Sequence, residues 1–479
     1  MQISRVTSNS LLILFAEITD RAMRFVLVIF AARILGDADF GKLAFAIAFG
    51  SLFLILADFG LHQLLIREIA RKPEDAQKLL GNGLVLKLLL AGLTFLCIYF
   101  AAQFTNKPSQ VLLTVYIVGG SLIAGSFADF FSTVFQGFQR MKYEAAGSLI
   151  LSVSNTLIGV VVLLLGGGFL QLAWVYLISR SLKIIYSVAM VALRFVPVKI
   201  SFEKKLTRYL LKEGAGFGVS RFFSMIYTYV DSTMLSLMVG DAVVGWYNVA
   251  YRLIFAMMVL PMGIMRAVYP ALSAYHKSNK EAFALLFQKT FKFMFAAGTS
   301  MATVLFVLSD KIILLLFGEE YHAAAQALRI LVWSTAIYAV GTVMTHSTRA
   351  AGKQGFTAKV VAGSALMNVL LNFVLIPKYS FVGAAFATLM SEFLTFTFHF
   401  WYVSRYMVKP PFFRLWPKIV VVNVGTAWIL WLMIDFSLFI VLGAAVPVNL
   451  GLMFLVRIYS KDELLSFYNM FKPIRGSNK

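Results

Sequence analysis

The residues of this chain with the clearest capacity for chemistry are charged side chains inside a long apolar run. Glu17, Asp20, Arg21 and Arg24 fall within residues 11–35. Their spacing places all four on one face of a helix. A charged stripe is costly to expose to hydrocarbon, so it either lines a polar cavity or is neutralised locally. Both interpretations stay open, because Glu17 with Arg21 and Asp20 with Arg24 are also acid–base pairs one turn apart.

A second polar stripe occurs in the other half of the chain. Arg221, Ser224, Thr228 and Asp231 follow helical spacing in another apolar segment. A weak internal repeat with an offset of 204 residues aligns Arg221 with Glu17. Opposite charges at equivalent positions lead us to expect a pair that forms across a cavity when one side closes.

The types of these side chains indicate which ligands they suit. A guanidinium stays charged and binds two phosphate oxygens at once, so arginine suits an anionic phosphate group. The predicted anion-binding residues are Arg21, Arg24, Arg221 and Arg252. The carboxylates expected to bind H⁺ or Na⁺ and bias a conformational equilibrium are Glu17, Asp20 and Asp231. Secondary candidates, equally open to a structural role, are Lys87, Arg180, Lys183 and Glu392.

Sequence signatures of enzymes and cofactor sites are absent. The chain has no P-loop, no H-E-x-x-H metal motif and no G-x-S-x-G elbow. Its single cysteine, Cys97, leaves no internal disulfide and no cysteine-based metal site. We therefore predict a protein that is not an enzyme, with no cofactor or metal other than a coupling ion, H⁺ or Na⁺.

The amino-acid composition indicates that these charges lie in a membrane protein. The chain has 479 residues, of which 60% are hydrophobic and 14% charged, with a formal net charge of +21. Soluble domains are about 45–50% apolar and about 25% charged, so a soluble fold could not hide this much apolar sequence. A nucleic-acid-binding protein would carry more charge and less aliphatic sequence. We predict an all-α integral membrane protein with many spans.

About fourteen transmembrane helices fit this length, because a span and its loop take about 30–35 residues. Hydropathy predicts them at residues 11–35, 41–60, 80–102, 111–135, 144–166, 170–193, 213–239, 245–269, 284–309, 326–348, 357–376, 381–404, 417–434 and 437–457. Basic residues are concentrated in alternate loops, as at Arg67, Arg71 and Lys72. By the positive-inside rule these loops and both termini are cytoplasmic, in the inner membrane of a prokaryote.

The internal repeat predicts the domain organisation. Residues 34–37 and 40–41 resemble residues 238–241 and 244–245. We expect two pseudo-symmetric six-helix lobes, residues 1–200 and 201–406, around a central cavity. Residues 407–479 then supply two additional transmembrane helices and a cytoplasmic tail. Six spans is an even number, so both lobes have the same orientation in the membrane.

Several local motifs occur in the order found in a known family. They are Ala57-Asp58-Phe59-Gly60-Leu61, Gly245-Trp246-Tyr247-Asn248, Phe317-Gly318-Glu319-Glu320-Tyr321, and Asn368 with Asn372, Ile376-Pro377, Gly383-Ala384-Ala385 and Ser391-Glu392. With them the chain resembles, over nearly its whole length, the polysaccharide flippases of the multidrug/oligosaccharidyl-lipid/polysaccharide exporter superfamily. These translocate O-antigen and capsule repeat units. The resemblance implies flipping of undecaprenyl-pyrophosphate-linked glycans from the cytoplasmic to the periplasmic leaflet by alternating access.

Other functions remain open from the sequence. A lipid-linked peptidoglycan precursor flippase would need the same cationic cavity. A cation-coupled multidrug exporter of the same superfamily would be expected to have an acidic cavity instead. An integral-membrane glycan polymerase or acyltransferase belongs to another class, and it would need a large external loop or a catalytic histidine. The expected partners are the lipid-linked glycan, membrane lipids and other glycan-assembly membrane proteins, with no nucleic acid.

Overall fold

The computed structural model describes the backbone of residues 2–459 and the side chains of residues 16–459 apart from Ser220. Every regular element in this part of the chain is a helix. Among the described residues, 11 helical segments are long and apolar enough to cross a membrane, judged by length and composition. The predicted all-α, multi-pass membrane fold is therefore confirmed.

The helices follow one another with short connections. The first group is α1 (Gln2–Asp58), α2 (Leu61–Arg71), α3 (Ala76–Gln103), α4 (Ser109–Gly137), α5 (Met141–Leu164) and α6 (Phe169–Arg194). The second is α7 (Lys204–Met238), α8 (Asp241–Met257), α9 (Val259–Ser278), α10 (Lys280–Phe317), α11 (Ala324–Ala350) and α12 (Gln354–Tyr406). The last two are α13 (Phe412–Leu432) and α14 (Leu438–Leu455).

Two long helices contain a break at positions where hydropathy places a gap between spans. Gly36 in α1 has φ 75°, a left-handed conformation that glycine adopts without strain. Ser380 in α12 has φ 53°. The backbone of each helix therefore turns at one residue instead of in a loop. The helix α7 is not among the 11 apolar segments, and the count of fourteen spans stays a prediction.

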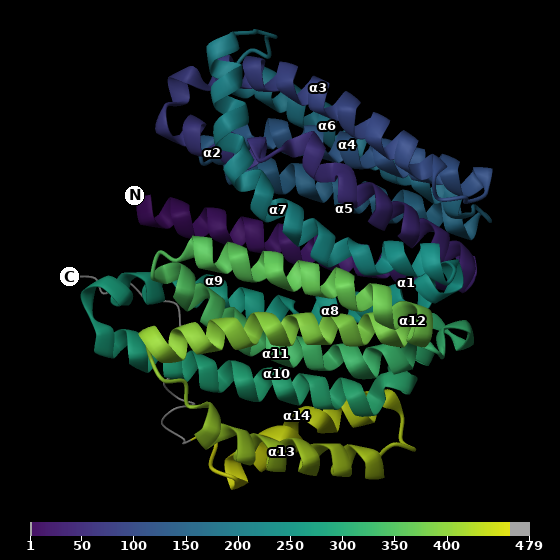
Figure 1. Cartoon of the computed structure of the whole chain (residues 1–479), viewed down its shortest axis with the longest axis vertical. Coiled ribbons are helices and arrows are strands. Elements are labelled where there is room, and N and C mark those ends of the chain that lie inside the picture. The colour runs from purple at the N-terminus through teal and green to yellow at the C-terminus, as the bar shows by residue number, and fades with distance from the viewer. Residues whose placement is uncertain (1, 460–479) are drawn as a thin grey trace. The chain divides into compact units, whose positions relative to one another are not determined.

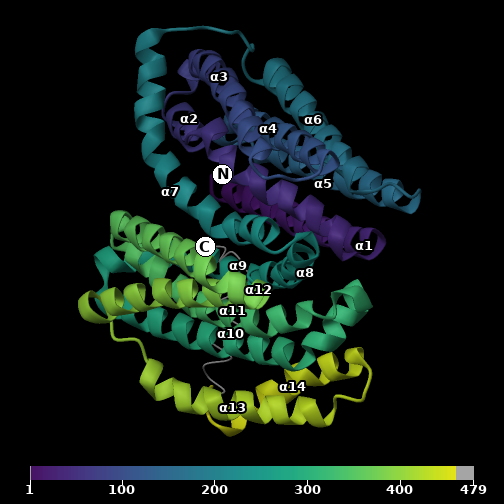
Figure 2. The same cartoon turned by 45° about the vertical axis from the view of Figure 1, so that its right-hand side comes forward.

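The chain forms two compact units, each described here by itself. The first consists of the chain up to Arg252 together with Leu316–Ala327 and Ala358–Ala387. The second contains the other residues from Leu253 onward. In the first unit α3, α4 and α6 lie side by side, as both views show (Figure 1, Figure 2). In the second unit α13 and α14 form an antiparallel pair.

The core of the first unit is built around α4. This helix is buried on several faces and packs against α6, α1, α2 and α3. Leu61, Leu64, Leu65 and Ile69 form the apolar face of the short amphipathic helix α2, and they join a buried cluster with Phe130 and other α4 side chains. A helix surrounded in this way can hold polar side chains away from lipid, and several residues of the candidate site extend from α4 or contact it.

Repeat-related glycines allow a close backbone contact within the first unit. A Cβ at Gly41 would collide with the carbonyl oxygen of Asp241, and a Cβ at Gly245 would collide with that of Asp37. Nearby, the Lys107 Nζ donates to the Asp241 carboxylate at 2.7 Å. These contacts place the break in α1, the end of α3 and the start of α8 on one side of the unit, which we call the Gly36 side.

The connection between α6 and α7 is fixed to the start of α3. Asn82 accepts a hydrogen bond from the Glu203 backbone N–H at 2.5 Å and donates to the Ser201 hydroxyl at 3.1 Å. Lys78 pairs with the Glu203 carboxylate at 2.6 Å. The missing side chain at Gly81 lets the same connection lie against the helix. Residues 199–203 of this connection are therefore packed against α3.

The second unit has an aromatic core and an apolar cavity. Phe283, Phe287 and Phe291 stack one turn apart along α10, with ring centroids 6.3 and 6.0 Å apart. A cavity of about 560 Å³ is lined mainly by apolar side chains of α10 and α14. Lys289 and Lys292 stand at one end of this lining. Asn449 on α14 donates to Thr426 on α13 at 3.0 Å, which ties the last two helices together.

Candidate functional site

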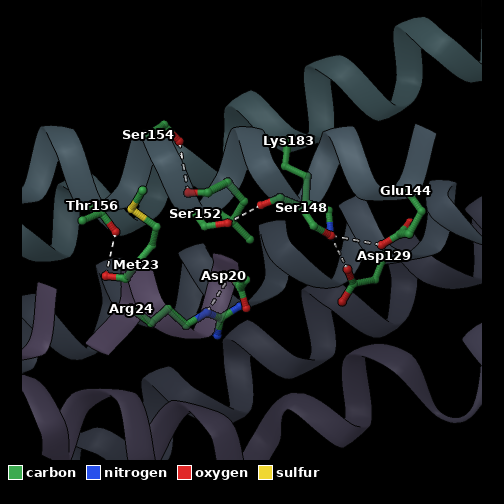
Figure 3. A network of polar contacts seen from close by, with 11 residues as sticks. Asp20, Met23, Arg24, Asp129, Glu144, Ser148, Ser152, Ser154, Thr156 and Lys183 are labelled. Carbon is green, nitrogen blue, oxygen red and sulfur yellow. Dashed lines mark hydrogen bonds and ion pairs between the residues drawn. The ribbon is translucent and has the colours of Figure 1, made fainter. Parts of the chain in front are cut away.

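The charged stripe on α1 contains one pair that closes within the helix. Arg24 Nε donates to Asp20 Oδ1 at 2.9 Å, one turn apart (Figure 3). The Arg24 side chain is 58% exposed, so this pair does not bury the guanidinium. Glu17 and Arg21, in the same stripe, are half-buried. The i,i+4 pairing expected from the sequence is thus formed by Asp20 and Arg24, and it leaves Arg24 available to a ligand.

Arginines from three helices of the first unit act electrostatically on Tyr176. The charges of Arg252 on α8, Arg180 on α6 and Arg24 on α1 all act on the Tyr176 phenol. The charge of Arg24 also acts on Arg180. We call these three residues the arginine cluster. Like charges gathered in a low-dielectric region repel one another, so such a group favours binding of an anion.

The members of the arginine cluster lie at the same depth. Arg24 is twelve residues before Gly36, and Arg180 and Arg252 are each eleven residues after the start of their helices. At 1.5 Å per residue, all three Cα atoms lie roughly 16–18 Å below the Gly36 side. That depth is about half of a hydrocarbon layer roughly 30 Å thick. The Cα atoms of the arginine cluster therefore lie near the middle of the membrane-spanning helices.

Two other cationic candidates, Arg221 and Lys87, lie outside the arginine cluster. Arg221 is seventeen residues before the end of α7, roughly 25 Å from the Gly36 side. Its buried Nε has no hydrogen-bond partner among the described residues. Lys87 is fully buried and donates to the Ala57 carbonyl at 2.8 Å and to Ser126, with Asp58 at 3.7 Å. Lys87 thus links α3 to the end of α1 and to α4, which is a structural arrangement.

Lys183 is held by two carboxylates inside the first unit. Its Nζ lies 2.9 Å from Asp129 Oδ1 and 3.8 Å from Glu144 Oε1 (Figure 3). The Lys183 side chain is 7% exposed, and it bridges α4, α5 and α6. One turn earlier on α6, Arg180 makes a different contact, because its Nη1 donates to the neutral Ser121 hydroxyl at 2.6 Å. Of these two neighbouring cations of α6, Lys183 is neutralised by carboxylates, whereas Arg180 bonds to a neutral hydroxyl.

A second polar site is built around Asp231. The buried Asp231 carboxylate accepts hydrogen bonds from the Tyr247 hydroxyl and the Asn372 side chain, both at 2.6 Å. Asn372 also donates to Asn368 at 3.1 Å. These four residues, which we call the Asp231 site, come from α7, α8 and α12. Two buried amide atoms of this site, Asn368 Nδ2 and Asn372 Oδ1, have no hydrogen-bond partner among the described residues.

The Asp231 site offers oxygen ligands but few charges. Carboxylate, amide and hydroxyl oxygens suit a hard monovalent cation, and a buried carboxylate also suits a proton. Within the described residues no group of three or more His, Cys, Asp or Glu could hold a metal ion. Glu392, the remaining candidate, lies half-buried on α12 in the second unit.

Family models match most of the first half of the chain and part of the second. The model described as polysaccharide biosynthesis protein matches residues 6–276. The MatE model matches residues 217–374. The two matches overlap over residues 217–276, from α7 into α9, and this stretch contains the second polar stripe.

Individual relatives are similar over nearly the whole chain. A probable low-salt glycan biosynthesis flippase, Agl15, of Haloferax volcanii is 23% identical, covering 98% of this chain and 96% of its own. A putative O-antigen transporter of Shigella dysenteriae is 23% identical, covering 81% of this chain and 98% of its own. Among solved structures, lipid II flippase MurJ in an inward closed conformation matches with a TM-score of 0.76 and 16% identity. That match covers 91% of this chain and 97% of MurJ, and it shows the same fold.

Proposed function

The chain belongs to the polysaccharide biosynthesis protein family, and we propose that it flips lipid-linked oligosaccharide repeat units across a membrane. The cargo is a glycan joined through a diphosphate to a polyprenyl lipid of the undecaprenyl type. It moves from the cytoplasmic to the periplasmic leaflet by alternating access. In this proposal the Gly36 side faces the periplasm of a prokaryotic cell, and both termini face the cytoplasm.

The arginine cluster carries this proposal. A diphosphate is an anion that hydrocarbon excludes, so a flippase must offer it compensating charge near the middle of the membrane. Arg24 and Arg252 lie at that depth on helices from the two halves of the chain. A guanidinium can bind two phosphate oxygens and is never deprotonated in proteins. Arg21 and Arg221 would then act at other depths along the path.

The lipid part of the cargo has a matching feature in the second unit. The cavity between α10 and α14 has a predominantly apolar lining that extends from Lys289 to Leu305. This stretch of α10 is roughly 24 Å long at the helical rise. Part of a polyprenyl chain would lie along it.

We assign ion coupling to the Asp231 site. A cation or proton bound by Asp231 would stabilise whichever conformation brings Asn372 and Tyr247 to its carboxylate, as in the structure. Release of the ion would weaken that conformation and allow the alternate one. Glu17 and Asp20 remain further candidates for an ion on α1.

A second candidate function is flipping of a lipid-linked peptidoglycan precursor. The observation that favours it is the fold likeness to lipid II flippase MurJ. Both cargoes share a polyprenyl diphosphate, so the arginine cluster fits either one. A multidrug exporter fits less well, because a cationic cluster repels the cationic compounds that such exporters carry.

The proposal can be tested in cells and in vesicles. After deletion of the gene, the lipid-linked glycan should accumulate in the inner leaflet, as measured by leaflet-selective labelling. Arg24→Ala and Arg221→Ala should each fail to restore transport at normal membrane abundance. Unchanged outer-leaflet glycan together with lost export of cationic dyes would instead establish the exporter function. Accumulation of peptidoglycan precursor alone would favour the second candidate.

A further inference from the structure

The connection between α6 and α7 carries a large excess of positive charge. From residue 194 to residue 212 the chain has six basic residues and one acidic residue, Glu203. The six basic residues are all exposed, and they are Arg194, Lys199, Lys204, Lys205, Arg208 and Lys212. Glu203 is already paired with Lys78 of α3 at 2.6 Å. Among the described residues of the first unit, none of the six forms an ion pair, and we call residues 194–212 the basic segment.

The basic segment lies at the end of helices that can cross a membrane. α6 and the helical stretch Pro73–Gln103, which contains α3, are both long and apolar enough to do so. The segment starts at the end of α6 and is bonded to the first two turns of α3 through Lys78 and Asn82. Its cations therefore lie where the hydrocarbon of a bilayer meets the headgroups.

Apolar side chains are exposed next to these cations. Ile200 and Phe202 are 69% and 65% exposed, and Leu193, just before the segment, is 73% exposed. Asn82 of α3 donates a hydrogen bond to the Ser201 hydroxyl at 3.1 Å, so Ile200 and Phe202 flank a residue that faces the protein. The basic segment thus combines positive charge with uncovered apolar surface, which are the two features by which a peripheral segment binds an anionic lipid surface.

Packing fixes the direction in which the cations of α7 point. Lys204, Arg208 and Lys212 recur every four residues, so they share one face of the helix. On the other face Leu210 is buried in the cluster around α4, and Leu206 packs against that cluster. The basic face therefore cannot turn inward. Because the segment is already ordered by these contacts and by α3, a ligand that binds it pays little for ordering it.

We propose that the basic segment binds anionic phospholipids of the bilayer. Lys204, Lys205 and Arg208 would contact the phosphate of the headgroup, and Ile200 and Phe202 would contact the apolar part of the lipid. Each basic residue near an anionic membrane surface strengthens binding about fivefold, so a few of them select anionic over zwitterionic lipid. A soluble phosphate compound would leave the two apolar side chains in water. The inference goes beyond the proposed function, because it concerns the surrounding lipid and not the cargo.

Two lipids with the same acyl chains test this assignment, dioleoyl phosphatidylglycerol and dioleoyl phosphatidylcholine. Native mass spectrometry of the full-length protein, titrated with each lipid in detergent, gives the two affinities. The wild type should bind phosphatidylglycerol about tenfold or more tightly than phosphatidylcholine. The triple variant Lys204→Gln, Lys205→Gln and Arg208→Gln should lose most of this difference, because binding of phosphatidylglycerol weakens and binding of phosphatidylcholine does not.

The matched control removes three exposed positive charges from other connections between helices. Lys277→Gln, Lys280→Gln and Lys353→Gln together should preserve the preference for phosphatidylglycerol. The double variant Ile200→Ser and Phe202→Ser should instead weaken binding of both lipids and keep the preference between them. Glycerol phosphate, a soluble form of the headgroup, should not displace phosphatidylglycerol at equal concentration. Gel filtration and thermal unfolding verify that each variant is folded.

Other results would overturn the assignment. Equal losses in the two triple variants would mean that the lipid responds to net charge and not to this segment. A preference that survives in the basic-segment variant and disappears in Arg252→Gln would place the lipid at the arginine cluster. Displacement by glycerol phosphate at equal concentration would indicate a site for soluble anions. Each of these results leaves the flippase proposal standing, because transport of the lipid-linked glycan is measured separately.

Discussion

Gly41 and Gly245 occupy equivalent positions in the two halves of the chain, and each lies against the backbone carbonyl of the aspartate that precedes the other. The contact is reciprocal, since Gly41 meets Asp241 and Gly245 meets Asp37. Such an arrangement is expected where two related segments meet about a pseudo-twofold axis. It leaves no room for a side chain at either position.

Substitution of Gly41 should separate these segments. The added Cβ of Gly41→Ala has no space beside the Asp241 carbonyl, so we expect a destabilisation of about 1–3 kcal/mol. Gly120→Ala is the control, because a Cβ there meets no atom within 4 Å. Thermal unfolding of the purified proteins should show a lower Tm for Gly41→Ala only. Equal Tm values for the two variants would contradict the close contact.

The buried Lys87 should be required because it neutralises Asp58. Lys87→Met leaves the Asp58 carboxylate uncompensated at a buried position, and we expect a loss of about 3–5 kcal/mol. The double variant Lys87→Met with Asp58→Asn should recover much of this loss. Thermal unfolding measures both effects. A double variant no more stable than Lys87→Met would show that the pair is not the cause.

The Asp231 site should determine ion dependence. A bound ligand stabilises the folded state, so sodium chloride should raise the Tm of the wild type above its value in choline chloride of the same concentration. Asp231→Asn keeps the shape of the side chain but not its charge, and should abolish that increase. Asp39→Asn, which alters the pair of Asp39 with Lys42 on α1, is the control. A sodium effect that persists in Asp231→Asn would place the ion elsewhere.

Arg252 should contribute more to anion binding than Arg24. Both replacements remove one positive charge, but the Arg24 guanidinium already gives part of its hydrogen-bonding capacity to Asp20, so it has less to offer the cargo. We expect Arg252→Gln to weaken binding of a farnesyl diphosphate-linked sugar by about 10–100-fold, and Arg24→Gln by less. Fluorescence titration of the two variants gives the comparison. A larger effect of Arg24→Gln would mean that Asp20 releases Arg24 when the cargo binds.

The cavity of the second unit should be sensitive to chain length. Each buried methylene contributes about 0.8 kcal/mol, so affinity for prenyl diphosphates should rise from geranyl to farnesyl to geranylgeranyl. Ala297→Trp fills the cavity and should flatten this increase. Leu285→Trp, at an exposed position on the same helix, should leave it intact. If affinity does not depend on chain length in the wild type, the lipid lies elsewhere.

Features that depend on local geometry could be predicted from the sequence. The contact between Asp20 and Arg24 follows from helical spacing alone, and the breaks at Gly36 and Ser380 fall where hydropathy places gaps between spans. The repeat offset of 204 residues also anticipates that Gly41 and Gly245 are related. Each of these needs only the neighbouring residues or a comparison of the chain with itself.

Contacts between distant helices could not be predicted in this way. Asn372 meets Asp231 across 141 residues, and Arg180 meets Ser121 across 59. The i,i+4 spacing of Asn368 and Asn372 does indicate a shared helix face, but not what it faces. Lys87 and Lys183 look alike in sequence as intramembrane cations. Only packing shows that carboxylates neutralise both and that Arg180 differs.

The docked connection between α6 and α7 has a consequence for how the molecule could be taken apart. Asn82, Lys78 and Gly81 fasten residues 199–203 to α3 by polar bonds and close packing. These contacts do not depend on the peptide bonds that precede residue 199. We therefore expect a chain nicked near Val196 to keep its two pieces attached. Two polypeptides that meet at that point and are produced together should therefore associate through these contacts, although no peptide bond joins them.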